Sequence, residues 1–197
     1  MEVSQIGDPA RIVSGTTKIT RDPVGLRIAG LAAQVVKHSG YLKDGFSFQT
    51  GAGGASLAVA KYVEEMMEKE NIKGSFCMGG ITGYMVDMAN KGYFESILDV
   101  QCFDLKAIES IRENPKHQEI SAMRYASPAA KSAAVDSLDV VILGATQVDV
   151  NFNVNVHTDS NGYIMGGSGG HSDTAAGSKL SIIVAPLIRA RLPLIVD

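Results

Sequence analysis

The residues of this sequence best suited to chemistry are the glycines of three clusters. They are Gly51-Ala52-Gly53-Gly54, Gly79-Gly80 and Gly166-Gly167-Ser168-Gly169-Gly170. A glycine loop between a strand and a helix presents free N–H groups at the positive end of the helix dipole. Such a loop can bind a phosphate or stabilise the oxyanion of an acyl-transfer intermediate.

The first cluster follows a strand-like segment, residues 46–50, and precedes an amphipathic helix with charges on its outer face. It does not match the Walker pattern, because no Lys-Ser/Thr pair follows it. These residues alone leave two interpretations open. The loop binds a ligand, or it is a tight turn that lets the helix pack closely on the sheet.

The third cluster is followed by His171 and Asp173 and leads into a strand-like segment at 181–185. Ordered elements on both sides favour a ligand loop over a flexible linker. His171 and Asp173 are then polar groups of the site, or else solvated loop residues. Another polar set, which would share one face of an extended segment, is either part of the site or the wet face of an edge strand: Gln147, Asp149 and Asn151.

Composition excludes several functional classes. The net charge of −3 and the lack of basic runs argue against nucleic-acid binding. No apolar stretch approaches the roughly 20 residues of a membrane span, and the N-terminus lacks a signal-peptide pattern. Cys77 and Cys102 have no metal-type spacing and read as buried thiols of a reducing compartment. We therefore expect a cytoplasmic protein, and no metal site or Ser–His–Asp set can be argued from spacing.

Helical and strand-like segments alternate along the chain. Asp22-Pro23 predicts a helix start, with the helix ending before Ser39-Gly40, and Asp104 predicts a capped helix ending before Asn114. Two further helices are expected after residue 54 and over about 85–91. Strands are expected at 46–50, 75–78, 97–103, 138–143, 181–185 and 192–196, with a turn at 159–162.

This alternation predicts an α/β domain with a mostly parallel sheet flanked by helices. Sites in such sheets form where strands end and helices begin, so we expect the glycine clusters to meet at one edge. We expect a single domain over residues 1–197. The sequence ends in the apolar residues Leu194, Ile195 and Val196, which suggests a fragment truncated at its C-terminus.

Taken in order, these motifs resemble the family I CoA-transferases over roughly residues 44–186. The pattern runs from Phe48-Gln49-Thr50-Gly51-Ala52-Gly53-Gly54, through Met78-Gly79-Gly80-Ile81-Thr82-Gly83-Tyr84-Met85, to the third cluster with His171-Ser172-Asp173. Within that family the sequence is most similar to the citrate lyase α subunits, almost residue by residue at 12–23 and 44–51. This closer similarity, to the citrate lyase α subunits, covers essentially the whole chain. We therefore interpret the chain as the C-terminal half of such a subunit.

The resemblance implies a CoA-transferase-like α/β fold with two similar halves. It also implies transfer of a carrier thioester from acetate to citrate. Tyr84 stands where the related enzymes carry a nucleophilic Glu, and a phenol is a poor substitute for a carboxylate. The citrate carboxylate would therefore attack the thioester directly and form a mixed anhydride. Gly51 to Gly54 would supply oxyanion donors, while Gly79, Gly80, the 166–170 loop, His171 and Asp173 would bind the carrier arm.

No cofactor is then expected to be bound directly, since the CoA-like phosphopantetheine group is held by an acyl-carrier subunit. The expected partners are citrate, acetate, the acyl-carrier subunit and the lyase subunit, in an oligomer. Cations for the citrate carboxylates could come from Arg124, Arg189 or Arg191, although surface positions suit these residues better. Two alternatives stay open: a generic CoA-transferase or CoA-ester hydrolase using a carboxylate such as Asp87, and a non-catalytic ligand-sensing or scaffold domain.

Overall fold

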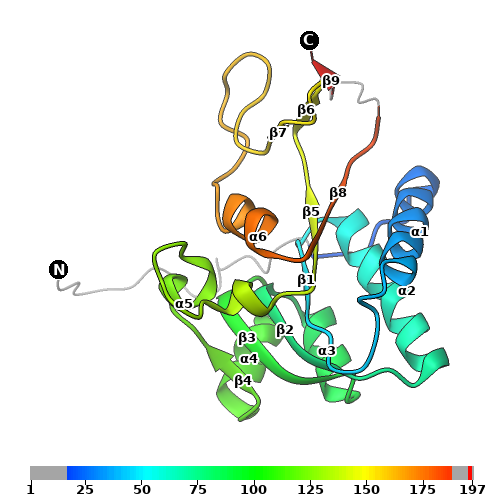
Figure 1. Cartoon of the computed structure of the whole chain (residues 1–197), viewed down its shortest axis with the longest axis vertical. Helices are drawn as coiled ribbons and strands as arrows, with labels where there is room; N and C mark the ends of the chain where they lie inside the picture. The colour runs from blue at the N-terminus through cyan, green and yellow to red at the C-terminus, as the bar shows by residue number, and fades with distance from the viewer. Residues whose placement is uncertain (1–16, 188–194, 197) are drawn as a thin grey trace.

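The computed structural model describes residues 17–187 and the backbone of residues 195–196. Its centre is a six-stranded sheet in the order β4-β3-β2-β1-β5-β8 (Figure 1). Every neighbouring pair in this sheet is parallel, which confirms the predicted fold class. The strands are β1 Phe48–Thr50, β2 Gly74–Ile81, β3 Phe94–Cys102, β4 His117–Glu119, β5 Val140–Gly144 and β8 Leu180–Val184.

Four helices cover one face of the sheet: α1 Pro23–His38, α2 Gly54–Glu70, α3 Gly83–Asn90 and α4 Leu105–Glu113. Their start signals are local. The Asp22 side chain accepts a hydrogen bond from Gly25 N at 2.7 Å, and Asp104 accepts one from Ala107 N at 3.0 Å. Both caps confirm the helix starts predicted from the sequence. Buried alanines of α1 let it pack closely on α2.

Shorter elements cover the opposite face: α5 Ala122–Ala126, the 3-10 helix η2 Ala134–Ser137 and α6 His171–Gly177. Successive strand residues point to opposite faces, so β5 contributes Val140 and Ile142 to one core layer and Val141 and Leu143 to the other. The continuous apolar run of this strand is therefore explained by burial on both faces.

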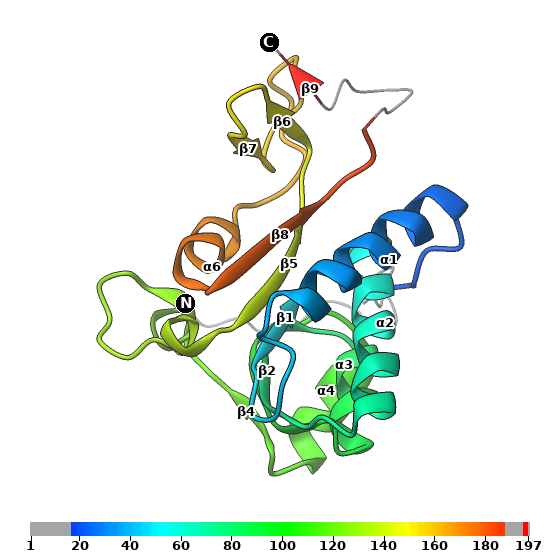
Figure 2. The ribbon, with the colours of Figure 1, turned by 45° about the vertical axis from the view of Figure 1, so that its right-hand side comes forward.

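A small second sheet stands beyond the carboxyl end of β5 (Figures 1 and 2). It contains β6 Gln147–Asp149, β7 Val154–Asn155 and β9 Ile195–Val196, in the order β7-β6-β9. The predicted turn at 159–162 is confirmed, since Gly162 N donates to Asp159 O at 3.0 Å. Of the strand expected at 192–196, residues 195–196 form β9, and residues 192–194 lie outside the described residues.

Strand β2 differs from its predicted extent. It does not end before Gly79-Gly80 but continues through both to Ile81, and its register against β3 shifts between the two glycines. Gly79 has φ +105°, a conformation that side chains other than glycine rarely adopt. The second cluster is thus an irregular strand, not a loop that follows one.

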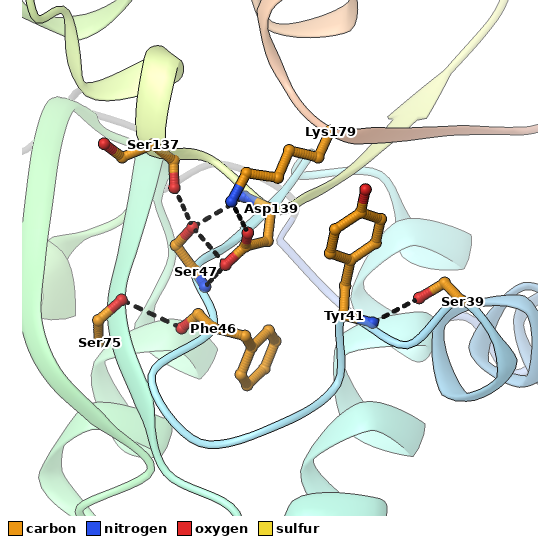
Figure 3. A network of polar contacts seen from close by, with 8 residues as sticks. All are labelled: Ser39, Tyr41, Phe46, Ser47, Ser75, Ser137, Asp139 and Lys179. Carbon is orange, nitrogen blue, oxygen red and sulfur yellow. Dashed lines mark hydrogen bonds and ion pairs between the residues drawn. The ribbon is translucent and has the colours of Figure 1, made fainter.

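A polar network connects the amino ends of β1, β5 and β8 (Figure 3). The glycine loops follow the carboxyl ends of the strands, at the opposite end of the sheet. Ser47 Oγ, just before β1, donates to Ser137 O at 2.7 Å. Lys179 Nζ, just before β8, lies 2.7 Å from Asp139 Oδ1. These contacts fix the positions at which the strands begin, and they leave the carboxyl ends of the strands free for ligands.

Candidate functional site

The candidate site lies where the sheet changes direction. From β1 the chain adds β2, β3 and β4 on one side, and then returns to place β5 and β8 on the other. In open parallel sheets a crevice opens at the carboxyl ends of the two strands beside such a switch point. Here those strands are β1 and β5, whose carboxyl ends are followed by Gly51 and Ala145.

A cavity of about 890 Å³ occupies this edge. Its walls come from β1 and β3, the start of α5, and the segment leading into α6. The lining residues are Gln49, Thr50, Gly51, Gly80, Val100, Gln101, Phe103, Ala122, Met123, Tyr125, Ala126, Ser127, Pro128, Leu143, Gly167, Ser168, Gly169, Gly170, His171 and Asp173. Members of all three glycine clusters therefore border one cavity, as expected from the strand-end argument.

Close packing explains two of the cavity glycines. A Cβ at Gly80 would lie 1.9 Å from Phe103 Cε2, and one at Gly170 would lie 2.4 Å from Tyr125 Cε1. Both glycines are needed so that aromatic rings can rest on the backbone of the wall. By contrast, a Cβ at Gly167 meets nothing within 4 Å.

Gln49 and Tyr125 join the two sides of the cavity. Gln49 Nε2 donates to Tyr125 Oη at 2.8 Å, and both side chains are buried. Burial raises the pKa of the Tyr125 phenol, so it stays neutral and can act as a donor or an acceptor. Sequence reasoning missed both residues. The available signal for Gln49 was a polar side chain within a short strand, two residues before a glycine loop.

His171 and Asp173 begin α6 and line the cavity. Burial, together with the nearby His157, lowers the pKa of His171, so this imidazole is neutral at pH 7. Asp173 is the only carboxylate among the lining residues, which include no Lys or Arg. The described wall is therefore almost uncharged and suits a neutral ligand segment better than a polyanion.

The first glycine cluster only partly faces this cavity. Gly51 lines it, but the Gly51 N–H donates to Ile142 O at 3.0 Å and is not free. Within the described part of the chain, the N–H groups of Ala52 and Gly53 have no hydrogen-bond acceptor, and α2 has no side-chain cap. Gly54, the first residue of α2, packs against the preceding segment: its carbonyl accepts from Thr20 N at 3.1 Å, and a Cβ there would lie 3.0 Å from Lys18 O. Any oxyanion donors must therefore come from Ala52, Gly53 or the first turn of α2.

Tyr84 lies outside this cavity. It lines a different hollow of about 1340 Å³ on the helical face, between α2, α3, α4 and residues 17–21. Its hydroxyl donates to Glu64, which also accepts from Lys91 Nζ at 2.8 Å. Burial and the Glu64 contact raise the Tyr84 pKa above its ordinary value. Asp87 lines the same hollow and pairs with Lys106 Nζ at 2.5 Å.

The remaining candidates among the described residues also lie apart from the cavity. Gln147 donates to Ser160 Oγ and accepts from Asn155 Nδ2 at 3.0 Å. Asp149 accepts from the backbone N of Asn151 and of Asn153, at 2.8 Å each, so β6 ends there and Asn151 does not share its extended face. Arg124 is exposed on α5, and Arg189 and Arg191 lie outside the described residues. Of the described side chains in this set, namely Gln147, Asp149, Asn151 and Arg124, none lines the cavity.

The described residues contain no group of three or more His, Cys, Asp or Glu side chains placed to hold a metal ion. None of their helices combines the length and apolar character needed to cross a membrane.

Comparison with known proteins identifies the family. The family described as "Citrate lyase, alpha subunit (CitF)" matches residues 1–197. The chain belongs to the citrate lyase α-subunit family. Its sequence is 52% identical over 197 residues to the citrate lyase alpha chains of Klebsiella pneumoniae and of Escherichia coli (strain K12). These matches cover 100% of this chain but 39% of each relative, so the chain spans about two fifths of their length.

Solved structures agree with the family assignment. A putative citrate lyase alpha subunit from Streptococcus mutans, solved in complex with citrate, shares 50% identity with a TM-score of 0.93. That match covers 99% of this chain and 38% of the other. RipA from Yersinia pestis shares 15% identity with a TM-score of 0.60, over 93% of this chain and 42% of RipA, which indicates a common fold.

Proposed function

We propose that this chain contributes to the citrate:acetyl-carrier transferase step of citrate lyase, in the cytoplasm, exchanging acetate for citrate on a carrier thioester. One observation carries the proposal. Members of the three glycine clusters, Gly51, Gly80 and Gly167, border a single, nearly uncharged cavity at the switch point of the sheet, although about 30 residues separate the first two and about 90 the last two. A phosphopantetheine-like arm is long, neutral and amide-rich between its phosphate and its thiol. Such an arm fits a wall built from glycine backbone, aromatic rings and neutral polar groups.

Citrate is the proposed acyl acceptor because the family is that of citrate lyase and the Streptococcus mutans relative was solved with citrate. Its three carboxylates require cations, and none lines this cavity among the described residues. Those cations must therefore come from another part of the protein or its assembly. The acyl-carrier and lyase subunits are proposed as partners of the same complex.

The proposed chemistry has two displacements. A citrate carboxylate oxygen attacks the acetyl thioester carbonyl, the C–S bond breaks, and the carrier leaves as a thiolate from a mixed acetyl–citryl anhydride. The thiolate then attacks the citryl carbonyl, and acetate leaves as the C–O bond breaks. Each addition develops an oxyanion, which the N–H groups of Ala52 and Gly53, unpaired among the described residues, could stabilise. Positioning of the two acids supplies the remaining rate enhancement.

The competing mechanism uses a protein carboxylate as the nucleophile. Asp87 is remote from the cavity and paired with Lys106, which disfavours it. Asp173, as the lining carboxylate, is the residue that a covalent mechanism would use. The two mechanisms move different oxygen atoms, so they can be separated by isotope.

The test is a single turnover of the full-length protein with acetyl-carrier thioester and citrate labelled with ¹⁸O in its carboxylates. Direct attack transfers one ¹⁸O atom from citrate to the released acetate. A covalent protein ester instead releases unlabelled acetate in the first turnover and places ¹⁸O in the protein carboxylate. Mass spectrometry of acetate, with borohydride trapping of any protein thioester at Asp173 or Asp87, distinguishes these results. Failure to form any citryl thioester, with CoA esters or sugar phosphates binding instead, would favour a different member of the fold or a sensing domain.

A further inference from the structure

Gln49 carries an unsatisfied polar atom at the cavity. Its side chain is 5% exposed and borders the cavity at the end of β1. Among buried side-chain oxygens and nitrogens of the described residues, Gln49 Oε1 is the one without a hydrogen-bond partner. An unpaired buried carbonyl costs free energy, and such atoms are rare in folded proteins. A ligand that donates a hydrogen bond to this oxygen would remove that cost.

The hydrogen bond to Tyr125 shows which end of the Gln49 amide is unpaired. Gln49 Nε2 donates to the Tyr125 hydroxyl at 2.8 Å, across 76 positions in sequence. The nitrogen end of the amide therefore has a protein partner, and the oxygen end has none among the described residues.

The backbone of Gly79 holds the amide in place. A Cβ at this position would lie 2.9 Å from Gln49 Cδ, and the positive φ of Gly79 brings the strand against the amide plane. The carbonyl of Gln49 is therefore a preorganised acceptor, which selects for a donor on the ligand and against a carboxylate or phosphate oxygen.

We propose that Gln49 Oε1 accepts a hydrogen bond from an amide N–H of the pantetheine arm and thereby sets how far the thioester enters the cavity. This assignment rests on the proposed transferase function. The alternative donor is the tertiary hydroxyl of citrate. The arm is favoured because the lining residues include no Lys or Arg to accompany a tricarboxylate. Gln49 is thus a positioning residue for the neutral part of the carrier group.

The test compares acetyl-pantetheine with two analogues, in each of which one amide N–H is replaced by an ester oxygen. In the full-length protein, kcat/KM should fall at least tenfold for one of the two esters, about the value of one hydrogen bond. Gln49→Met should lower kcat/KM for the amide substrate by a similar factor and leave that ester unaffected, so the amide-to-ester preference disappears. Gln101→Met, a change at an exposed residue of the same cavity, should retain the preference.

A second variant guards against misfolding. Tyr125→Phe keeps the Gln49 carbonyl but removes the acceptor that orients the amide, so the preference should shrink without disappearing. An amide-to-ester preference unchanged in Gln49→Met would overturn the assignment, as would a loss that instead follows citrate against its deoxy analogue tricarballylate. If wild-type protein is active with citrate and either result is found, the positioning role fails while the proposed function stands. If wild-type protein makes no citryl thioester, the proposed function itself fails.

Discussion

Ser47 and Asp139 exchange hydrogen bonds across the boundary between β1 and β5. Ser47 N donates to Asp139 Oδ2 at 2.9 Å, and Asp139 N donates to Ser47 Oγ at 2.8 Å, although 92 positions separate the two residues in sequence. Figure 3 shows the pair, which lies at the amino ends of β1 and β5, whereas the cavity lies at the carboxyl ends of these strands. The pair therefore holds the register of β1 on β5 without contacting a substrate.

Removing this hydroxyl should affect stability and spare catalysis. Ser47, which is buried, supplies the acceptor for the Asp139 N–H, so Ser47→Ala should lower the free energy of unfolding by about 1–3 kcal/mol. Urea denaturation measures this loss, and kcat should stay within about twofold of wild type. Ser75→Ala is the matched control, because Ser75 Oγ makes a single longer contact, 3.2 Å to Phe46 O. Equal losses in the two variants would contradict the role assigned to Ser47.

Gly80→Ala should damage activity more than folding. The new methyl group would overlap the Phe103 ring, which lines the cavity, so the ring must shift and the shape of the cavity changes. We expect kcat/KM to fall at least tenfold, with a loss in the free energy of unfolding of about 1–3 kcal/mol. Combining Gly80→Ala with Phe103→Leu should recover part of the activity. Gly167→Ala, where nothing lies within 4 Å, should be close to wild type in both measurements.

Gly53→Val tests the oxyanion role of the first glycine cluster. Gly53 has φ −66° and ψ 146°, and the nearest atom to an added Cβ is Ser56 Oγ at 3.9 Å, so the fold should accept the side chain. The branched side chain would crowd the unpaired N–H groups of Ala52 and Gly53. Turnover should fall by about 10²-fold, the range seen when one oxyanion donor is lost. A folded variant with normal turnover would assign this cluster to helix–sheet packing.

Tyr84→Phe should have little effect on turnover. The Tyr84 hydroxyl is bound to Glu64 in the hollow of the helical face, away from the switch-point cavity. Losing this partly exposed contact should cost about 1 kcal/mol or less, and kcat should change less than twofold. A loss of 10² in kcat with normal thermal stability would show that the Tyr84 hollow takes part in the reaction.

Both cysteines should resist alkylation in the native protein. Burial raises the pKa of Cys77 to about 12, and burial together with the Asp99 contact raises that of Cys102 to about 12, from an ordinary value of 9.0. Because the thiol form is favoured in the folded state, this contribution to stability is complete below pH 9. It is lost as the pH rises from about 9 to 12. Iodoacetamide at pH 8 should label both residues rapidly in urea and slowly in buffer, and rapid native labelling of Cys102 would contradict its placement.

Local sequence signals were sufficient for much of this fold. The Asp22 and Asp104 caps and the apolar run of β5 each depend on neighbouring residues, and each was predicted correctly. The convergence of glycine clusters followed from the geometry of parallel sheets. By contrast, α6 begins inside a glycine-rich segment and spans 7 residues, too short for a helical period to be recognised.

The site details depended on contacts between distant residues. Gln49 meets Tyr125 across 76 positions, and no spacing along the chain indicates that pairing. The Gln49 amide also lies against the Gly79 backbone, a contact that neighbouring residues in the sequence do not indicate. Asn151 left the expected strand face because Asp149 captures the following backbone N–H groups in a turn. Tyr84 follows β2 on a helix whose packing directs the side chain towards α2.

The strand order also has a kinetic consequence. On a ribosome the chain emerges from its N-terminus, so β1 can pair with β2 early, while its other neighbour, β5, arrives about 90 residues later. During that interval one side of β1 is an open edge, and the Ser47 N–H has no acceptor. Unpaired strand edges can pair with strands of other chains, so a nascent chain that exposes one is prone to aggregation. Synthesis of residues 139–144 therefore ends the period in which the growing protein most needs protection.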